Sequence, residues 1–194
     1  MLKSEFMLCS AVVCFWASNL FSQFPSAEKL IAEQQNALAP LKKMDGKWRG
    51  TAWTIRPDGK KIEMVQTERV GSMLEGAAKA VEGRAYDEDG KIVFNAFAMI
   101  TYDPMSKKIT MRSTAQGRVG EFEIKLTKTG FTWEIPAGPA TIRYVAEITE
   151  GKWTEYGERL IPDQKPFRFM EMNLRRIGDT DWPSAGAVQP EEKK

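Results

Sequence analysis

Apolar and polar residues alternate along most of this chain, in short segments that turn residues separate. Residues 122–126 read Phe-Glu-Ile-Lys-Leu, and residues 142–148 alternate in the same way. Each segment is therefore predicted to form a strand with one buried face. Turn chemistry follows at sites such as Pro57-Asp58-Gly59 and Asp103-Pro104. The pattern predicts about eight to ten strands, within residues 46–56, 61–70, 73–85, 91–102, 108–116, 119–128, 131–135, 140–149, 152–160 and 167–177.

The tight turns also predict how these strands connect. No helical pattern interrupts residues 43–178, so consecutive strands pair antiparallel as a meander. A meander of this length avoids exposed edges most simply by closing on itself. The predicted fold class is all-β, an antiparallel up-and-down barrel of about eight to ten strands, with a two-sheet sandwich as the alternative.

One short helix is predicted before the barrel. Pro25 and Ser26 form a helix start signal, and apolar or amide side chains recur at helical spacing until Pro40. These side chains are Leu30, Ile31, Gln34, Leu38 and Leu41. The sequence thus predicts an N-terminal helical segment at residues 23–42, a barrel domain at 43–178, and a flexible tail at 179–194, which is rich in Pro, Gly and charge.

Residues 1–22 have the pattern of a secretory signal peptide. Lys3 precedes an apolar run at residues 6–16, and small or polar residues follow. The run is too short and too interrupted for a membrane span, so no integral membrane segment is expected after cleavage. Cleavage after Ser22 would remove Cys9 and Cys14 and leave a disulfide-free mature protein. We therefore expect a secreted or periplasmic location.

Composition excludes several function classes. The 28 Lys and Arg residues nearly balance 26 Asp and Glu residues, and the net charge of +2 is too small for a nucleic-acid-binding surface. The absence of His excludes His-based catalytic triads and His-ligated metal sites. No carboxylate stands among apolar residues in a way that suggests a raised pKa, and the run at 87–89 has the pattern of a solvated turn. We expect no metal, no cofactor and no enzymatic activity.

The first and last strands carry a family resemblance. Gly46-Lys47-Trp48 opens the first strand, and residues 167–176, Phe-Arg-Phe-Met-Glu-Met-Asn-Leu-Arg-Arg, end the last one. This pairing resembles the closure of calycin barrels, the lipocalin and fatty-acid-binding group. Residues 41–177 as a whole resemble a family of bacterial lipocalin-like domains of unknown function. The resemblance implies that Trp48 closes one end of the barrel and that the Arg176 guanidinium caps it.

Large side chains on the inner face of the predicted strands are candidates to line a ligand cavity. A barrel of this size holds one small ligand. The candidates are Met64, Gln66, Met111, Phe122, Trp133, Tyr144, Met170 and Met172. Gln66 and Glu68 are unusual as inward polar residues, and they either bind a ligand or mark the wet, open end.

Two functions remain open from the sequence. The first is a carrier of a small apolar or amphipathic molecule, and the second is a solid barrel that acts as an interaction or structural module. Residues 91–102 are apolar on both faces. We therefore expect the helix or an oligomer partner to cover their outer side.

Overall fold

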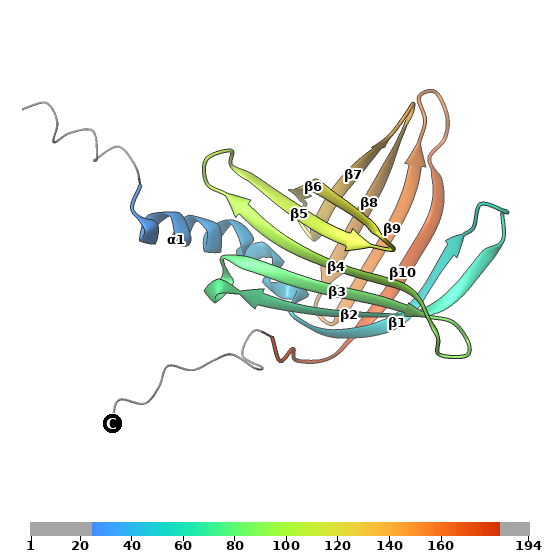
Figure 1. Ribbon diagram of the computed structural model, residues 1–194, viewed down its shortest axis with the longest axis horizontal. Helices are drawn as coiled ribbons and strands as arrows, with labels where there is room; N and C mark the ends of the chain where they lie inside the picture. Colours follow the sequence, from blue (N-terminus) through green and yellow to red (C-terminus); the bar gives the residue numbers. More distant parts are fainter. Residues whose placement is uncertain (1–24, 183–194) are drawn as a thin grey trace, which may run out of the picture.

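The computed structural model describes residues 25–182, which form a closed ten-stranded antiparallel barrel (Figure 1). The strands are Gly46–Ile55 (β1), Lys61–Met73 (β2), Ala78–Tyr86 (β3), Ile92–Asp103 (β4), Lys108–Ala115 (β5), Arg118–Leu126 (β6), Gly130–Ala137 (β7), Ala140–Thr149 (β8), Lys152–Leu160 (β9) and Phe167–Gly178 (β10). Each pairs with its chain neighbours, and β10 returns to β1. The predicted up-and-down barrel is confirmed, and the sandwich alternative is wrong. The predicted signal peptide lies outside the described residues.

A helix and a short 3₁₀ segment close one end of the barrel. The Ser26 side chain caps helix α1, Ala27–Leu38, by accepting a hydrogen bond from the Lys29 backbone N–H at 3.4 Å. The 3₁₀ segment η2, Ala39–Met44, follows with Pro40 in its first turn. Leu38, Leu41 and Met44 are buried, so this segment plugs the barrel end from which β1 departs.

The core is densest beneath this plug. Side chains from six strands meet there with at most 2% of their surface exposed, namely Trp48, Val70, Ile100, Ile148, Trp153 and Leu174. The rings of Trp48 and Trp153 pack edge to face with centroids 5.8 Å apart. Gly50, on the same face of β1 as Trp48, lets β10 approach closely, because a Cβ there would stand 2.0 Å from the Asn173 carbonyl oxygen.

The turn between β2 and β3 lies later than predicted. Strand β2 extends to Met73, and a 3₁₀ turn at Leu74–Gly76 reverses the chain before β3 begins at Ala78. Leu74 and Glu75 adopt left-handed φ angles of 50° and 57°, and Gly76 has φ 99°. Leu and Glu rarely adopt left-handed φ angles, so the residue types at these positions did not predict a turn.

One join in the barrel wall is incomplete. Strands β6 and β7 pair only beside their connecting turn, at Lys125↔Thr132 and Leu126↔Phe131. By contrast, β7 and β8 pair along their full length, from Gly130↔Glu147 to Ala137↔Ala140. Beyond the turn β6 and β7 diverge (Figure 1), and we call this unpaired stretch the β6–β7 seam.

The outer face of β4, where we expected the helix or an oligomer partner, is partly covered by Trp182. Its large apolar side chains Phe97 and Met99 remain 45% and 47% exposed. Trp182 packs on Phe97 with ring centroids 6.2 Å apart, and the Arg69 guanidinium lies 4.2 Å from the Trp182 ring centroid. Gly71 lies directly under Trp182, where a side chain would collide. The chain that we expected to form a tail from residue 179 is therefore packed on the barrel as far as Trp182.

Candidate functional site

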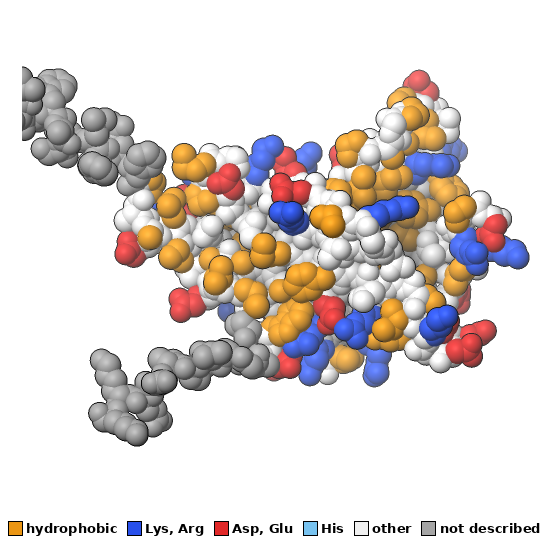
Figure 2. Space-filling view, viewed as in Figure 1, with side chains coloured by type: hydrophobic (Ala, Val, Ile, Leu, Met, Phe, Trp, Pro, Cys, Tyr) orange, Lys and Arg blue, Asp and Glu red, His pale blue; other side chains and the backbone are white. Residues whose placement is uncertain are grey.

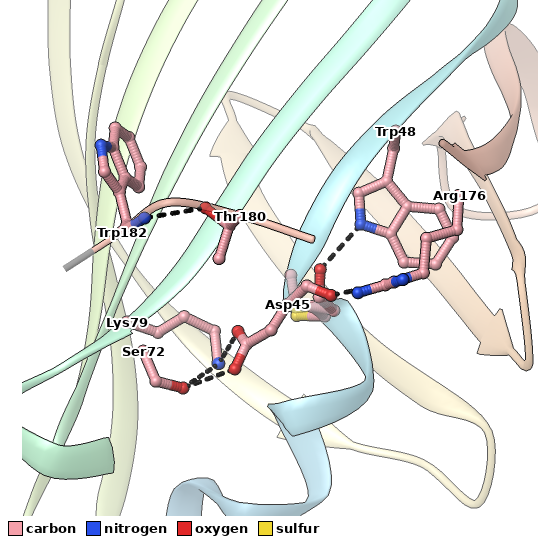
Figure 3. Close-up of polar contacts among 8 residues, drawn as sticks. Asp45, Trp48, Ser72, Lys79, Arg176, Thr180 and Trp182 are labelled. Carbon is pink, nitrogen blue, oxygen red and sulfur yellow. Dashed lines mark hydrogen bonds and ion pairs between the residues drawn. The ribbon is translucent and has the colours of Figure 1, made fainter. Parts of the chain in front are cut away.

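Trp48 and Arg176 meet at the closed end as a structural pair (Figure 3). They lie opposite each other in the β1–β10 register. Trp48 Nε1 donates a hydrogen bond to the Met44 carbonyl at 2.8 Å, and Arg176 Nε donates to the Asp45 carbonyl at 3.3 Å. Arg176 also pairs with Asp179. Both side chains thus hold the end of η2, and neither reaches the interior candidates.

A buried ion pair that the sequence analysis missed lies beside this closure (Figure 3). Lys79 Nζ donates to Asp45 Oδ1 at 2.5 Å and to Ser72 Oγ at 2.9 Å, and the Lys79 residue is 1% exposed. Burial lowers the pKa of Lys79, and the Asp45 carboxylate opposes that shift. The sequence did hold an indication of this buried lysine, because Lys79 lies two residues before Val81 on β3 and therefore on the same, inner face of the strand. The pair fixes η2 to β2 and β3.

The eight predicted lining residues fall on the inner wall at different depths. Met111, Met172 and Gln66 are buried in the wall. The other five, Met64, Phe122, Trp133, Tyr144 and Met170, are half-buried although they share the inner face of their strands. The barrel is therefore solid at the plugged end and less tightly filled toward the other end.

Four aromatic rings form a continuous series across this less filled region. Trp133 and Tyr144 stack with centroids 4.1 Å apart and planes 7° from parallel. Phe122 lies 4.9 Å from Trp133, and Phe169 lies 6.0 Å from Tyr144. We call these four rings the aromatic ladder. It crosses the β6–β7 seam, because Phe122 is on β6 and Trp133 is on β7. Figure 2 shows a hollow with hydrophobic side chains on its floor beside these strands.

Phe169 was missed by the sequence analysis because a β-bulge changes its phase. The β10–β9 register shifts between Arg168 and Met170, so both Phe169 and Met170 lie over Gly157. A Cβ at Gly157 would stand 2.8–2.9 Å from Phe169, Met170 and Tyr144. Gly157 thus creates the space in which this end of the ladder packs.

Two glutamates occupy the inner wall near the ladder. Gln66 Nε2 donates to Glu68 Oε1 at 2.7 Å, and the Glu68 carboxyl lies against the bare backbone of Gly83. Burial raises the pKa of Glu68 to about 8 and that of Glu155 to about 7. The expectation that no carboxylate has a raised pKa is therefore wrong. Glu155 escaped notice because β9 carries polar residues on both faces, so its inner phase was not evident.

Glu155 is linked to the aromatic side chains around it. The indole N–H groups of Trp133 and Trp153 lie near its carboxyl and act to lower its pKa, against the larger effect of burial. Burial raises the pKa of Tyr144 to about 12, and the charge of Glu155 adds to that shift. Glu68, Glu155 and the aromatic ladder therefore form one candidate site.

Other kinds of site are not found in the described part of the chain. Within residues 25–182 there is no group of three or more acidic, Cys or His side chains placed to hold a metal ion. In the same range no helix has the length and hydropathy of a membrane span.

Comparison with solved structures supports a calycin-like barrel. The protein Rv2717c from M. tuberculosis superposes with a TM-score of 0.55 at 11% identity, over 73% of this chain and 97% of its own. The S-type phycobiliprotein lyase CPES from Guillardia theta superposes with a TM-score of 0.50 at 11% identity, over 80% of this chain and 100% of its own. No protein-family model matches this chain. No curated protein matches it either.

Proposed function

We propose that this calycin-like barrel is a secreted or periplasmic carrier that binds one small, partly apolar ligand along the aromatic ladder. Calycin-like barrels use their interior for ligands, and the bilin lyase among the similar structures has this fold. The role proposed is binding without catalysis, as expected from the sequence.

The half-buried ladder is the observation that carries the proposal. Phe122, Trp133, Tyr144 and Phe169 point inward yet keep part of their surface free. Rings that filled a solid core would be buried as fully as Trp48, which is 1% exposed. The ladder also crosses the β6–β7 seam, where the two strands are joined by no backbone pairing beyond Lys125↔Thr132.

Fluorescence titration with N-phenyl-1-naphthylamine, a neutral apolar probe, tests this function. We expect saturable binding that quenches Trp133 and raises the free energy of unfolding by about 2.7 kcal/mol at a hundredfold excess over Kd. Trp133→Ala should weaken binding at least tenfold. Trp53→Ala, on the outer wall beneath Lys61, is the matched control and should leave Kd unchanged. Equal effects of the two substitutions, or no binding, would contradict an interior site.

Export has its own test. The support is the pattern of residues 1–22, so protein purified from its native host should begin near Gln23 and contain no thiol. An intact Met1 on cytosolic protein would overturn the location and leave the ligand proposal untouched.

The exposed face of β4 favours the second candidate function, an interaction module. Phe97 and Met99 present a large apolar surface that Trp182 covers only in part. If this function holds, Phe97→Ser with Met99→Ser should abolish self-association or partner binding, measured by sedimentation velocity, while N-phenyl-1-naphthylamine binding persists. A wild-type chain that is monomeric at all concentrations would argue against self-association.

A further inference from the structure

We propose that the outer wall of β2, β3 and β4 holds a docking site for a partner protein segment in which an acidic residue precedes a tryptophan. The chain's own Asp181-Trp182 occupies this site as an internal competitor. We call the site the tryptophan socket, and its residues are Arg69, Gly71, Ala80 and Phe97. The inference rests on the second candidate function and names the chemistry of its partner.

The floor of the socket has no large side chain. Gly71 on β2 and Ala80 on β3 lie opposite each other on the outer face of the wall. A Cβ at Gly71 would stand 2.5 Å from the Trp182 Cβ, and the three atoms nearest to that position all belong to Trp182. Phe97 lies edge to face with the indole at an interplanar angle of 73°. A glycine within a strand lets another part of a chain approach closely, so this wall is shaped to receive an aromatic side chain.

Arg69 supplies the charge of the socket. Its Nη2 lies 2.8 Å from Asp181 Oδ1, while its guanidinium group lies over the Trp182 ring. Glu82, opposite Arg69 on β3, forms its own ion pair with Arg84. A carboxylate and a ring face thus bind the same guanidinium group. Trp and Arg are also the residues that most often dominate the binding energy of protein interfaces. This complementarity indicates an acidic residue followed by a tryptophan as the occupant.

The chain's own segment fills the site incompletely. Arg69 Nε is buried and has no hydrogen-bond partner among the described residues, although a buried donor without an acceptor is unfavourable. Phe97 and Met99 also stay nearly half exposed with Trp182 in place, and Figure 2 shows hydrophobic side chains gathered over these strands. A partner segment with one more acceptor and a larger apolar surface would therefore fit the wall better than residues 179–182 do.

Residues 179–182 are also held in a way that allows their displacement. In the part of the chain that the structure describes, no backbone hydrogen bond joins this segment to the barrel. The Trp182 backbone N–H instead donates to Thr180 Oγ1 within the segment, at 3.2 Å (Figure 3). The ion pairs of the segment involve Asp179 and Asp181, whose side chains are exposed, and exposed ion pairs contribute little to stability. A partner therefore has to displace little more than one indole.

Fluorescence anisotropy with a labelled peptide tests the inference. The probe is fluorescein-labelled Ile-Gly-Asp-Thr-Asp-Trp, which repeats residues 177–182, and the receptor is the full chain with Trp182→Ala, which empties the socket. We expect saturable binding of the probe to this variant. The wild type should bind the probe at least about tenfold more weakly, because its own segment competes at a high local concentration. Probes that end in Asp-Ala or Asn-Trp should also bind more weakly than the probe that ends in Asp-Trp.

Further substitutions in the Trp182→Ala chain locate the bound probe. Gly71→Val fills the floor of the socket and Arg69→Gln removes its charge, so each should weaken probe binding at least about tenfold. Gly71 pairs regularly with β3, and valine suits such a strand position. Thr51→Val, at an exposed outer position of β1, is the matched control and should leave Kd unchanged. Equal affinity in all these variants, or equal affinity of the wild type and Trp182→Ala, would overturn the inference.

The remaining outcomes separate this inference from the functions proposed above. If no probe binds while Phe97→Ser with Met99→Ser abolishes self-association, the interaction module stands and the peptide docking site is wrong. If Trp182→Ala self-associates in sedimentation velocity and excludes the probe, the occupant is a second copy, which also contradicts the inference. If neither probe binding nor self-association occurs, the inference and the interaction module are both wrong. Binding of N-phenyl-1-naphthylamine decides the carrier function in every case.

Discussion

Trp48 and Arg176 act at the residue scale through two consecutive carbonyls. Trp48 binds the Met44 carbonyl from inside the barrel, and Arg176 binds the Asp45 carbonyl from the strand that closes it. The resemblance suggested a guanidinium that caps the indole itself. In the structure both side chains bind the end of η2, so each helps to hold the segment to which the other binds.

The first prediction follows from this shared anchor. Trp48→Ala should destabilise the barrel by roughly 3–5 kcal/mol, as removal of a large buried aromatic side chain does. A double-mutant cycle with Arg176→Ala, measured by urea unfolding, should show a coupling energy of about 0.5 kcal/mol or more. Additive losses would mean that the two contacts hold η2 independently.

The second prediction concerns the pH dependence of stability. Glu68 and Glu155 have folded-state pKa values of about 8 and about 7, above the ordinary value of 4.5, so the folded protein binds more protons than the unfolded chain between these limits. Their contribution is complete below pH 4.5 and is lost as pH rises through 7 and 8, by up to about 1.4 kcal/mol per pH unit for each carboxyl.

Urea unfolding at pH 5, 6, 7 and 8 measures this slope. The unfolding free energy should fall with rising pH, and the variant Glu68→Gln with Glu155→Gln should flatten the curve. Glu121→Gln should leave the slope as it is in the wild type. A wild-type stability that rises over this range would contradict the raised pKa values.

Residue-scale prediction from sequence succeeded where the side chain follows the strand period. Trp133 and Tyr144 were placed inward by alternation alone, and the structure stacks them. Phe169 was not, because a bulge takes it out of that period. Glu155 was not, because β9 carries polar residues on both faces, so alternation does not indicate which of them point inward.

At the scale of elements, α1 and η2 contribute unequally to the stability of the barrel. Helix α1 rests on the barrel with polar contacts, such as the bond from the Tyr102 hydroxyl to Glu33 at 3.0 Å. The 3₁₀ segment η2 instead inserts Leu41 and Met44 into the core. Turn-forming residues predicted most strand ends correctly, but they did not predict the left-handed turn at Leu74–Gly76.

The third prediction compares two apolar side chains of this region. Leu41→Ala should cost about 2–5 kcal/mol, because Leu41 is fully buried in the plug. Ile31→Ala, on the exposed face of α1, should cost less than about 1 kcal/mol. Thermal unfolding of the two variants gives the comparison, and similar losses would mean that α1 is as tightly packed as η2.

At the scale of the whole molecule, the barrel is tightly packed at one end, and one of its strand pairs, β6 with β7, is incomplete. The plug, the Trp48 cluster and the Lys79–Asp45 pair lie at the same end. The seam and the aromatic ladder lie away from it. Sequence periodicity predicted the closed topology, but it could not predict where one strand pair would separate, because β6 and β7 alternate as regularly as their neighbours.

The fourth prediction locates mobility at the seam. β6 pairs with β5 and β7 pairs with β8, but the backbone amides of β6 and β7 that face each other beyond Lys125↔Thr132 lack cross-strand partners. These amides should exchange with deuterium much faster than those of β9 and β10. A saturating ligand should slow exchange in residues 118–123 and 133–137. Uniform protection of all ten strands would show that the seam closes in solution.

The seam carries a further risk for the protein, since two unpaired strand edges invite a second copy to add its own strand. The chain places blocking residues at both edges. Pro136 in β7 has no backbone N–H to offer, and β6 carries the exposed carboxylates Glu121 and Glu123, of which Glu123 pairs with Lys108. Replacement of these three residues would leave both strand edges free to pair with a second copy of the chain. We expect fibrous aggregation as the consequence.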